Sequence, residues 1–114
     1  MPSPTPPGNG RGFANPYRGE ASLNVGGEAV VIRPSFGALV AAEEELGPLF
    51  ALVERASEGR LALGEMVALF DHLSREGRPA GITRERIGEA VVELGLAGVT
   101  PQLRAVLGQI LQGR

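Results

Sequence analysis

The fold is decided by the stretch Glu20-Ala-Ser-Leu-Asn-Val-Gly-Gly-Glu-Ala-Val-Val-Ile-Arg33, which places two extended runs around a pair of glycines. Gly26 and Gly27 can both adopt the positive φ values of a type I′ turn, whose twist matches that of the flanking strands. Apolar residues alternate along both runs and give the predicted hairpin one apolar face: Leu23, Val25, Val30 and Ile32. An isolated hairpin is marginal in water, so this face is expected to pack on the rest of the chain.

Five short amphipathic helices are predicted after the hairpin, because apolar residues recur there at helical spacing between clear start and stop signals. Ser35 and Thr83 are expected to cap the first and the fourth helix, and Ile82 is expected to pack on Ile87 as a hydrophobic staple. The expected helices span Phe36 to Leu46, Leu49 to Gly59, Gly64 to Glu76, Thr83 to Gly95, and a last helix that starts at Thr100 and Pro101.

The apolar faces of these helices are expected to meet in one core with the face of the hairpin, since none of the helices would be stable alone. The predicted class is therefore α+β, mostly α, with one domain over residues 15–114. Residues 1–14 are rich in Pro and Gly and are predicted to form a disordered tail.

The amino-acid composition of the chain argues against several classes of function. The chain of 114 residues has a formal net charge of −2, so its overall field argues against a phosphate backbone as partner. It contains no Cys, which fits a reducing cytoplasm, and no apolar run approaches the roughly 18 residues that span a bilayer. We expect a cytoplasmic protein that does not cross a membrane and whose overall charge disfavours nucleic acid as a partner.

The residues that carry chemistry are sparse. Asp71 and His72 are the only Asp and the only His of the chain, and neighbours on a helix point about 100° apart, so the two cannot serve each other. His72 is expected on a helix surface or rim. The spacings of zinc ligands are missing, and a phosphate-binding loop of the usual kind needs a Lys that the chain lacks. The sequence therefore predicts no enzyme, no cofactor and no metal site.

Two charged features remain open. Glu43 falls on the same arc of the first helix as Phe36 and Leu39, where a carboxylate is costly to bury without a partner. It is expected either to pair with an Arg or with backbone amides at a neighbouring helix start, or to anchor a cation of another protein. Phe36, Leu39 and Glu43 are accordingly the candidate partner-binding residues.

Four arginines gather around the connection between the third and fourth helices, which would suit the corner of a DNA-binding helix-turn-helix motif: Arg75, Arg78, Arg84 and Arg86. The connection is long and rich in Pro for that motif, and neighbouring glutamates dilute the positive charge. A small DNA-binding regulator is therefore the weaker alternative.

Three segments of the sequence resemble a protein family that is found in tailed phages and in gene transfer agents, which are phage-like particles. They are Asn15-Pro16-Tyr17-Arg18-Gly19-Glu20 before the hairpin, Arg33-Pro34-Ser35-Phe36-Gly37-Ala38-Leu39, and Glu43-Glu44-Glu45-Leu46-Gly47, followed by a closing pair of helices rich in Leu, Ala and Val. The resemblance covers about residues 15–112.

Members of that family look like tail assembly chaperones, which are thought to coat the long tape measure protein and to recruit tail tube subunits. The family has also been labelled a tail tube protein, and a tube subunit resembles a β-sandwich or barrel that closes rings through long strands. One hairpin and five helices fit the chaperone better. The resemblance thus implies the tape measure protein and tube subunits as partners, leaves homo-oligomers open, and keeps a structural tail component as the alternative.

Overall fold

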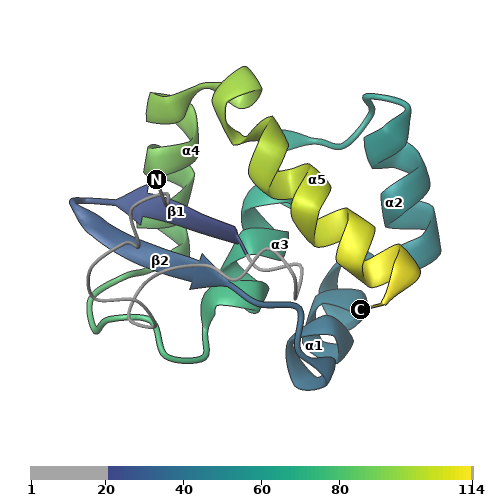
Figure 1. The fold of residues 1–114 in the computed structure, drawn as a ribbon, viewed down its shortest axis with the longest axis horizontal. Coiled ribbons are helices and arrows are strands. Elements are labelled where there is room, and N and C mark those ends of the chain that lie inside the picture. Colours follow the sequence, from purple (N-terminus) through teal and green to yellow (C-terminus); the bar gives the residue numbers. More distant parts are fainter. Residues whose placement is uncertain (1–20, 114) are drawn as a thin grey trace, which may run out of the picture.

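A computed structural model describes residues 21–113, so the tail predicted for residues 1–14 lies outside the described part of the chain. Figure 1 shows a hairpin of two antiparallel strands followed by five helices. This arrangement confirms the predicted α+β class. The elements are β1 (Ala21–Val25), β2 (Glu28–Ile32), α1 (Phe36–Leu46), α2 (Leu49–Ser57), α3 (Leu63–Ser74), α4 (Arg84–Leu94) and α5 (Leu96–Gln112).

The hairpin forms as its glycines predict. Gly26 has φ +60° and Gly27 has φ +88°, and the amide of Gly27 donates to Oδ1 of Asn24 at 2.9 Å. Leu23 pairs with Val30 across the ladder. The inward side chains of both strands are buried: Ala21, Leu23, Val25, Val30 and Ile32.

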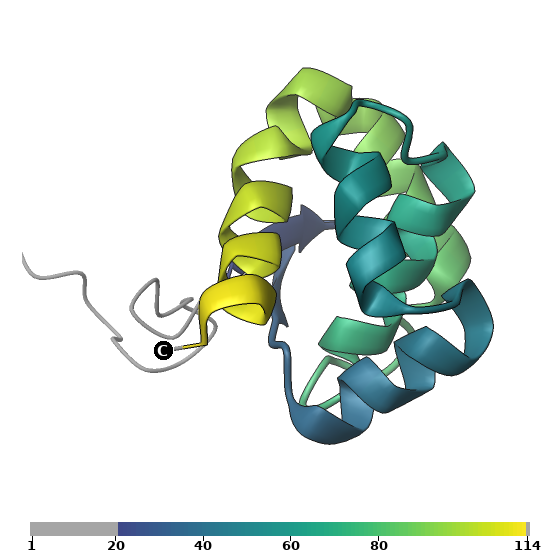
Figure 2. The ribbon, with the colours of Figure 1, turned by 90° about the vertical axis from the view of Figure 1, so that its right-hand side faces the viewer.

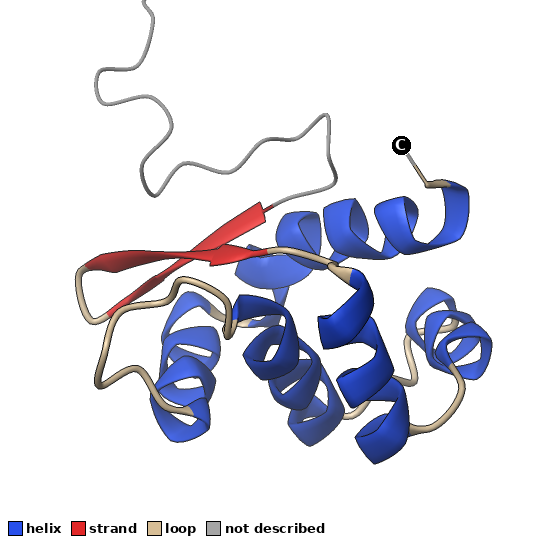
Figure 3. Ribbon diagram, turned by 90° about the horizontal axis from the view of Figure 1, so that it is seen from below, coloured by secondary structure: helices blue, strands red, loops and turns tan. Residues whose placement is uncertain are grey.

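The hairpin and α5 form one layer over α1, α3 and α4, while α2 lies at the edge of the molecule (Figure 3). α3 is the centre of the core, because every residue from Met66 to Ser74 is buried. α3 contacts α1, α4 and β2, and α5 contacts α4 and β1. The large apolar side chains at the centre include Phe70 and Leu69 of α3, Leu52 of α2 and Ile87 of α4.

The predicted caps are present. Oγ of Ser35 accepts the amide of Ala38 at 3.3 Å, and Oγ1 of Thr83 accepts the amide of Arg86 at 3.2 Å. Ile82 and Ile87, the residues of the predicted staple, are both buried in the core.

The predicted inner face of α1 is wrong in part. α1 buries Ala38 and Ala42, with Leu39 and Leu46 packed on the edge of the core. Phe36 is 85 % exposed, and Val40 is exposed as well. The helix carries two apolar stripes, and the one with alanines faces inward because small side chains let α1 approach α3 closely.

The predicted start of α5 is also wrong, because the helix begins at Leu96 and contains Pro101. Gly95 ends α4 with φ +86°, and its carbonyl immediately accepts the amides of Gly98 and Val99. Val99 is fully buried, so this early turn is held by the core. Pro101 has no amide hydrogen, so it cannot donate the helical hydrogen bond to the carbonyl four residues before it.

Candidate functional site

Asp71 is the centre of a buried charge cluster. Its side chain is only 2 % exposed and accepts hydrogen bonds from three arginines. Nη1 of Arg78 lies 2.7 Å from Oδ1, while Nη2 of Arg75 and Nε of Arg84 lie 2.6 and 3.1 Å from Oδ2. Three of the four arginines that suggested a helix-turn-helix corner are therefore bound to a carboxylate of the same domain.

Arg84 joins this cluster to α1. Its two terminal nitrogens bind the carboxylate of Glu45 at 2.7 and 2.8 Å, a bidentate pair. Oε1 of Glu45 also lies 2.7 Å from Nε2 of His72. The cluster thereby links α1, α3 and α4.

The prediction that His72 lies on a surface or rim is wrong. His72 is buried, and its Nδ1 has no hydrogen-bond partner among the described residues. The cause is the packing of α1 across α3, which covers this part of the helix and places Glu45 against the imidazole. A contact between residues so distant along the chain leaves no local signal in the sequence.

The hydrogen bonds of the cluster set the charges of its members. Those from Arg84 and then His72 lower the pKa of Glu45 to about 2. Burial raises the pKa of Asp71, but the hydrogen bonds from Arg78, Arg75 and Arg84 outweigh it and bring that pKa to about 2. The hydrogen bond to Glu45 raises the pKa of Arg84 above its ordinary value, against the effect of burial. Both carboxylates are therefore ionised at neutral pH, with their oxygens bound to cationic groups of the same domain.

Within residues 21–113, no group of three or more His, Asp or Glu side chains is arranged to hold a metal ion. The part of the surface that offers space for a ligand is apolar instead.

A groove of about 550 Å³ separates α2 from α5. Figure 2 shows the two helices side by side, with α1 below them. A smaller hollow of about 170 Å³ continues the groove toward α1, because both share Val53 and Leu111. We call the two together the α2–α5 groove. Its main apolar lining is Leu49, Phe50, Val53, Leu61, Met66, Leu96, Leu103, Leu107, Ile110 and Leu111.

The rim of the α2–α5 groove exposes large apolar side chains. Phe50 is 79 % exposed, Leu96 57 % and Leu111 53 %. Large apolar residues gathered around a groove are typical of a binding surface, whereas single exposed ones are common on any protein. The sequence signal for this site is in α2, where Leu49, Phe50, Leu52 and Val53 form one broad apolar face instead of a narrow stripe.

The structure brings only one of the three predicted partner-binding residues to this groove. Glu43 lies at its α1 end, is exposed, and accepts the backbone amide of Leu49 through Oε2 at 3.1 Å. The predicted contact of Glu43 with a neighbouring helix start is present, but the carboxylate is exposed and not buried as its place on the apolar arc predicts. Leu39 packs on the core, and Phe36 projects from the first residue of α1 without lining the groove. Their role in binding a partner stays a prediction.

No single helix of the described residues is long and apolar enough to cross a membrane. α4 and α5 reach that length and composition only as a pair, and the chain bends by 118° between them.

The fold and this surface define a small domain of one hairpin and five helices, with charged residues clustered inside and an apolar groove outside. The sequence model of a family described as "phage tail tube protein, GTA-gp10" matches residues 18–113. The chain belongs to this family of phage tail proteins, and membership implies interaction with other tail proteins. The search of curated proteins and the search of solved structures found no match.

Proposed function

We propose that the chain is a tail assembly chaperone, a non-catalytic cytoplasmic protein that binds the tape measure protein and tail tube subunits of a phage-like particle. The observation that carries this proposal is the α2–α5 groove. A groove between two helices, with an apolar floor and a ring of exposed Leu and Phe side chains, has the form that accepts an amphipathic helix. A long helical protein such as the tape measure would present helices of this kind.

The secondary structure supports a chaperone over a tube subunit. A tube wall made of long strands that close into rings needs several strands per subunit, and residues 21–113 contain one hairpin with strands of five residues each. A groove between helices can bind another helix reversibly, whereas a tube subunit must pair its strands permanently with those of its neighbours.

A non-catalytic role agrees with the way the carboxylates of Asp71 and Glu45 are bound inside the domain. Asp71 is enclosed by arginines, and Glu45 is held by Arg84 and His72, so their oxygens are not presented to a substrate. The absence of Cys from the sequence is consistent with a reducing cytoplasm.

The second candidate is a structural component of the tail, and the description of the family as a tail tube protein favours it. In that case the α2–α5 groove would be covered permanently by a neighbouring subunit. The two functions differ in whether the chain stays in the finished particle.

Co-expression with the tape measure protein tests the proposal. We expect the chain to keep that protein soluble and to co-purify with it, and Phe50→Ser to weaken the capture. Phe36→Ser tests the other predicted contact, because Phe36 is similarly exposed but lies outside the groove. Failure of the unmodified chain to co-purify would exclude the chaperone function. Loss of capture with Phe36→Ser alone would move the binding site to α1.

A further inference from the structure

A second groove lies between the first turns of α3 and the length of α4. Its floor is formed by Leu63, Gly64 and Val67 of α3 together with Gly88 and Val92 of α4. Leu63 and Val92 are large apolar side chains left exposed, Val92 to 65 %. The groove has a volume of about 860 Å³ and is shallow and open along its length. We call it the α3–α4 groove.

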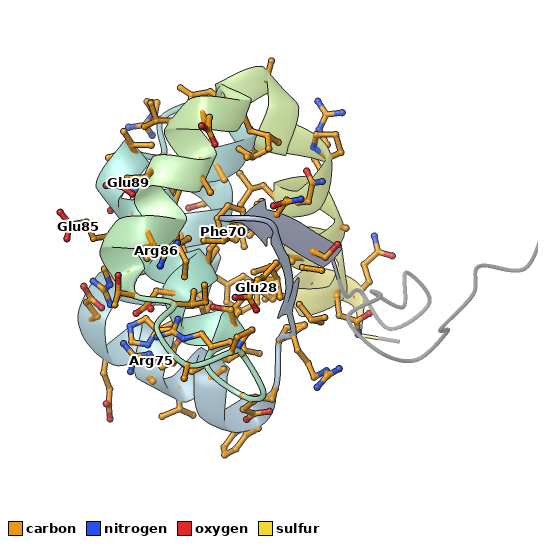
Figure 4. All side chains as sticks on the ribbon, turned by 90° about the vertical axis from the view of Figure 1, so that its left-hand side faces the viewer. Glu28, Phe70, Arg75, Glu85, Arg86 and Glu89 are labelled. Atoms are coloured by element: carbon orange, nitrogen blue, oxygen red, sulfur yellow. The ribbon has the colours of Figure 1, made fainter. Side chains whose placement is uncertain are left out.

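A row of glutamates forms one wall of the α3–α4 groove. Glu85, Glu89 and Glu93 follow one another at four-residue intervals along α4, so they project from the same side of the helix. Figure 4 shows Glu85 projecting outward from α4, while Glu89 and Glu93 also border a smaller hollow beside Gly26 of the hairpin turn. Like charges at this spacing destabilise an isolated helix.

Nothing in the described part of the chain neutralises this row, since none of the three glutamates has an ion pair with a residue between 21 and 113. Arg84 borders the groove but is bound to Glu45 and Asp71. Arg86 reaches over the hairpin turn, where its Nη2 would lie 2.6 Å from a Cβ added at Gly26, and it shares a small hollow with Glu89 and Glu93 without an ion pair to either. The three glutamates against one nearby arginine leave the wall with a net negative charge beside an exposed apolar floor.

The floor is flat where the two helices meet. Gly88 is in the middle of α4, and a Cβ there would make only an ordinary contact with Val67 at 3.6 Å. Packing inside the domain thus does not require glycine at this position, although glycine weakens a helix relative to alanine. A glycine here leaves room for another backbone to approach.

We propose that the α3–α4 groove is a docking surface for a basic amphipathic helix of another tail protein. The apolar stripe of that helix would cover the floor, and Lys or Arg residues at four-residue spacing along one flank would pair with Glu85, Glu89 and Glu93. The proposal rests on the charge and shape of this groove and is independent of what binds the α2–α5 groove.

A second copy of the chain does not fit this description. It would bring the same row of glutamates, and none of its helices within residues 21–113 offers two arginines free of ion pairs. The partner must therefore be a different chain with a basic flank.

Synthetic peptides test this surface directly. The probes are two helical peptides of about 18 residues with the same Leu stripe, one with Lys along a flank and the other with Glu at the same positions. We expect the Lys peptide to bind the isotope-labelled full chain and to shift the amide resonances of Gly64 and Gly88. The Glu peptide should bind at least about ten-fold more weakly.

Two variants locate the contact. Glu89→Lys should weaken binding of the Lys peptide by about five-fold or more, while Glu54→Lys on α2, an equal change of charge outside the groove, should have little effect. Gly88→Leu should block both peptides by filling the floor. Equal binding of the two peptides, equal losses with Glu89→Lys and Glu54→Lys, or resonance shifts confined to the α2–α5 groove would overturn the proposal. So would self-association of the free chain that Glu89→Lys abolishes.

Discussion

Replacing Asp71 with Asn tests whether the buried cluster holds α1, α3 and α4 together. The variant keeps the shape of the side chain but removes the charge that three arginines share. The pKa of Asp71 falls from 3.8 to about 2, which corresponds to a contribution of about 2 kcal/mol to the free energy of unfolding at neutral pH. Breaking a buried ion pair by removing one partner costs about 3–5 kcal/mol. Arg75 and Arg84 are partly exposed and can regain water, so we expect a loss of about 3 kcal/mol.

Urea unfolding followed by circular dichroism measures this loss. Because folding lowers the pKa of Asp71, its contribution is complete above about pH 5 and is lost as the pH falls toward 2. The difference between the two proteins should therefore shrink across that interval. Glu58→Gln is the control, because Glu58 pairs with Arg60 on the surface and its replacement should cost at most about 1 kcal/mol. A loss below about 1 kcal/mol for Asp71→Asn, or one that does not change between about pH 5 and 2, would refute this account of the cluster.

Three further substitutions test single positions. Gly88→Ala should raise the free energy of unfolding by about 0.5–1 kcal/mol, because the added methyl group only contacts Val67; a lower melting temperature would show that the site is tighter than the structure indicates. Gly26→Ala should cost about 1–2 kcal/mol in chemical denaturation, since φ is +60° and the new Cβ would meet the guanidinium of Arg86; an unchanged midpoint would contradict the positive-φ turn. Glu43→Gln should lower stability by less than about 1 kcal/mol and leave capture of the tape measure protein unchanged; a selective loss of capture would make Glu43 an anchor for the partner.

Much of the fold follows from local signals. Gly26 and Gly27 set the hairpin turn, and Ser35 and Thr83 set two helix starts, because turns and caps depend on residues close together in the sequence. The start of α5 was misplaced because Thr-Pro is a strong start signal, whereas the burial of Val99 depends on packing between elements.

The sites depend on such packing and were harder to predict. α1 has two apolar stripes, and only its contact with α3 decides that Ala38 faces inward while Phe36 faces solvent. The same contact buries His72 beside Glu45. The α2–α5 groove is formed by helices far apart in the sequence. The sequence shows that its lining residues are apolar, but not that they lie next to one another in space.

The composition of the finished particle tests the central claim most directly. Quantitative mass spectrometry can compare particles purified from tail-producing cells with the complexes that the tape measure protein forms in those cells during assembly. A tail assembly chaperone should be abundant in the assembling complexes and absent from the finished particle. Recovery of the chain from finished particles in a fixed ratio to the tube subunits would contradict the chaperone function and establish a structural component of the tail.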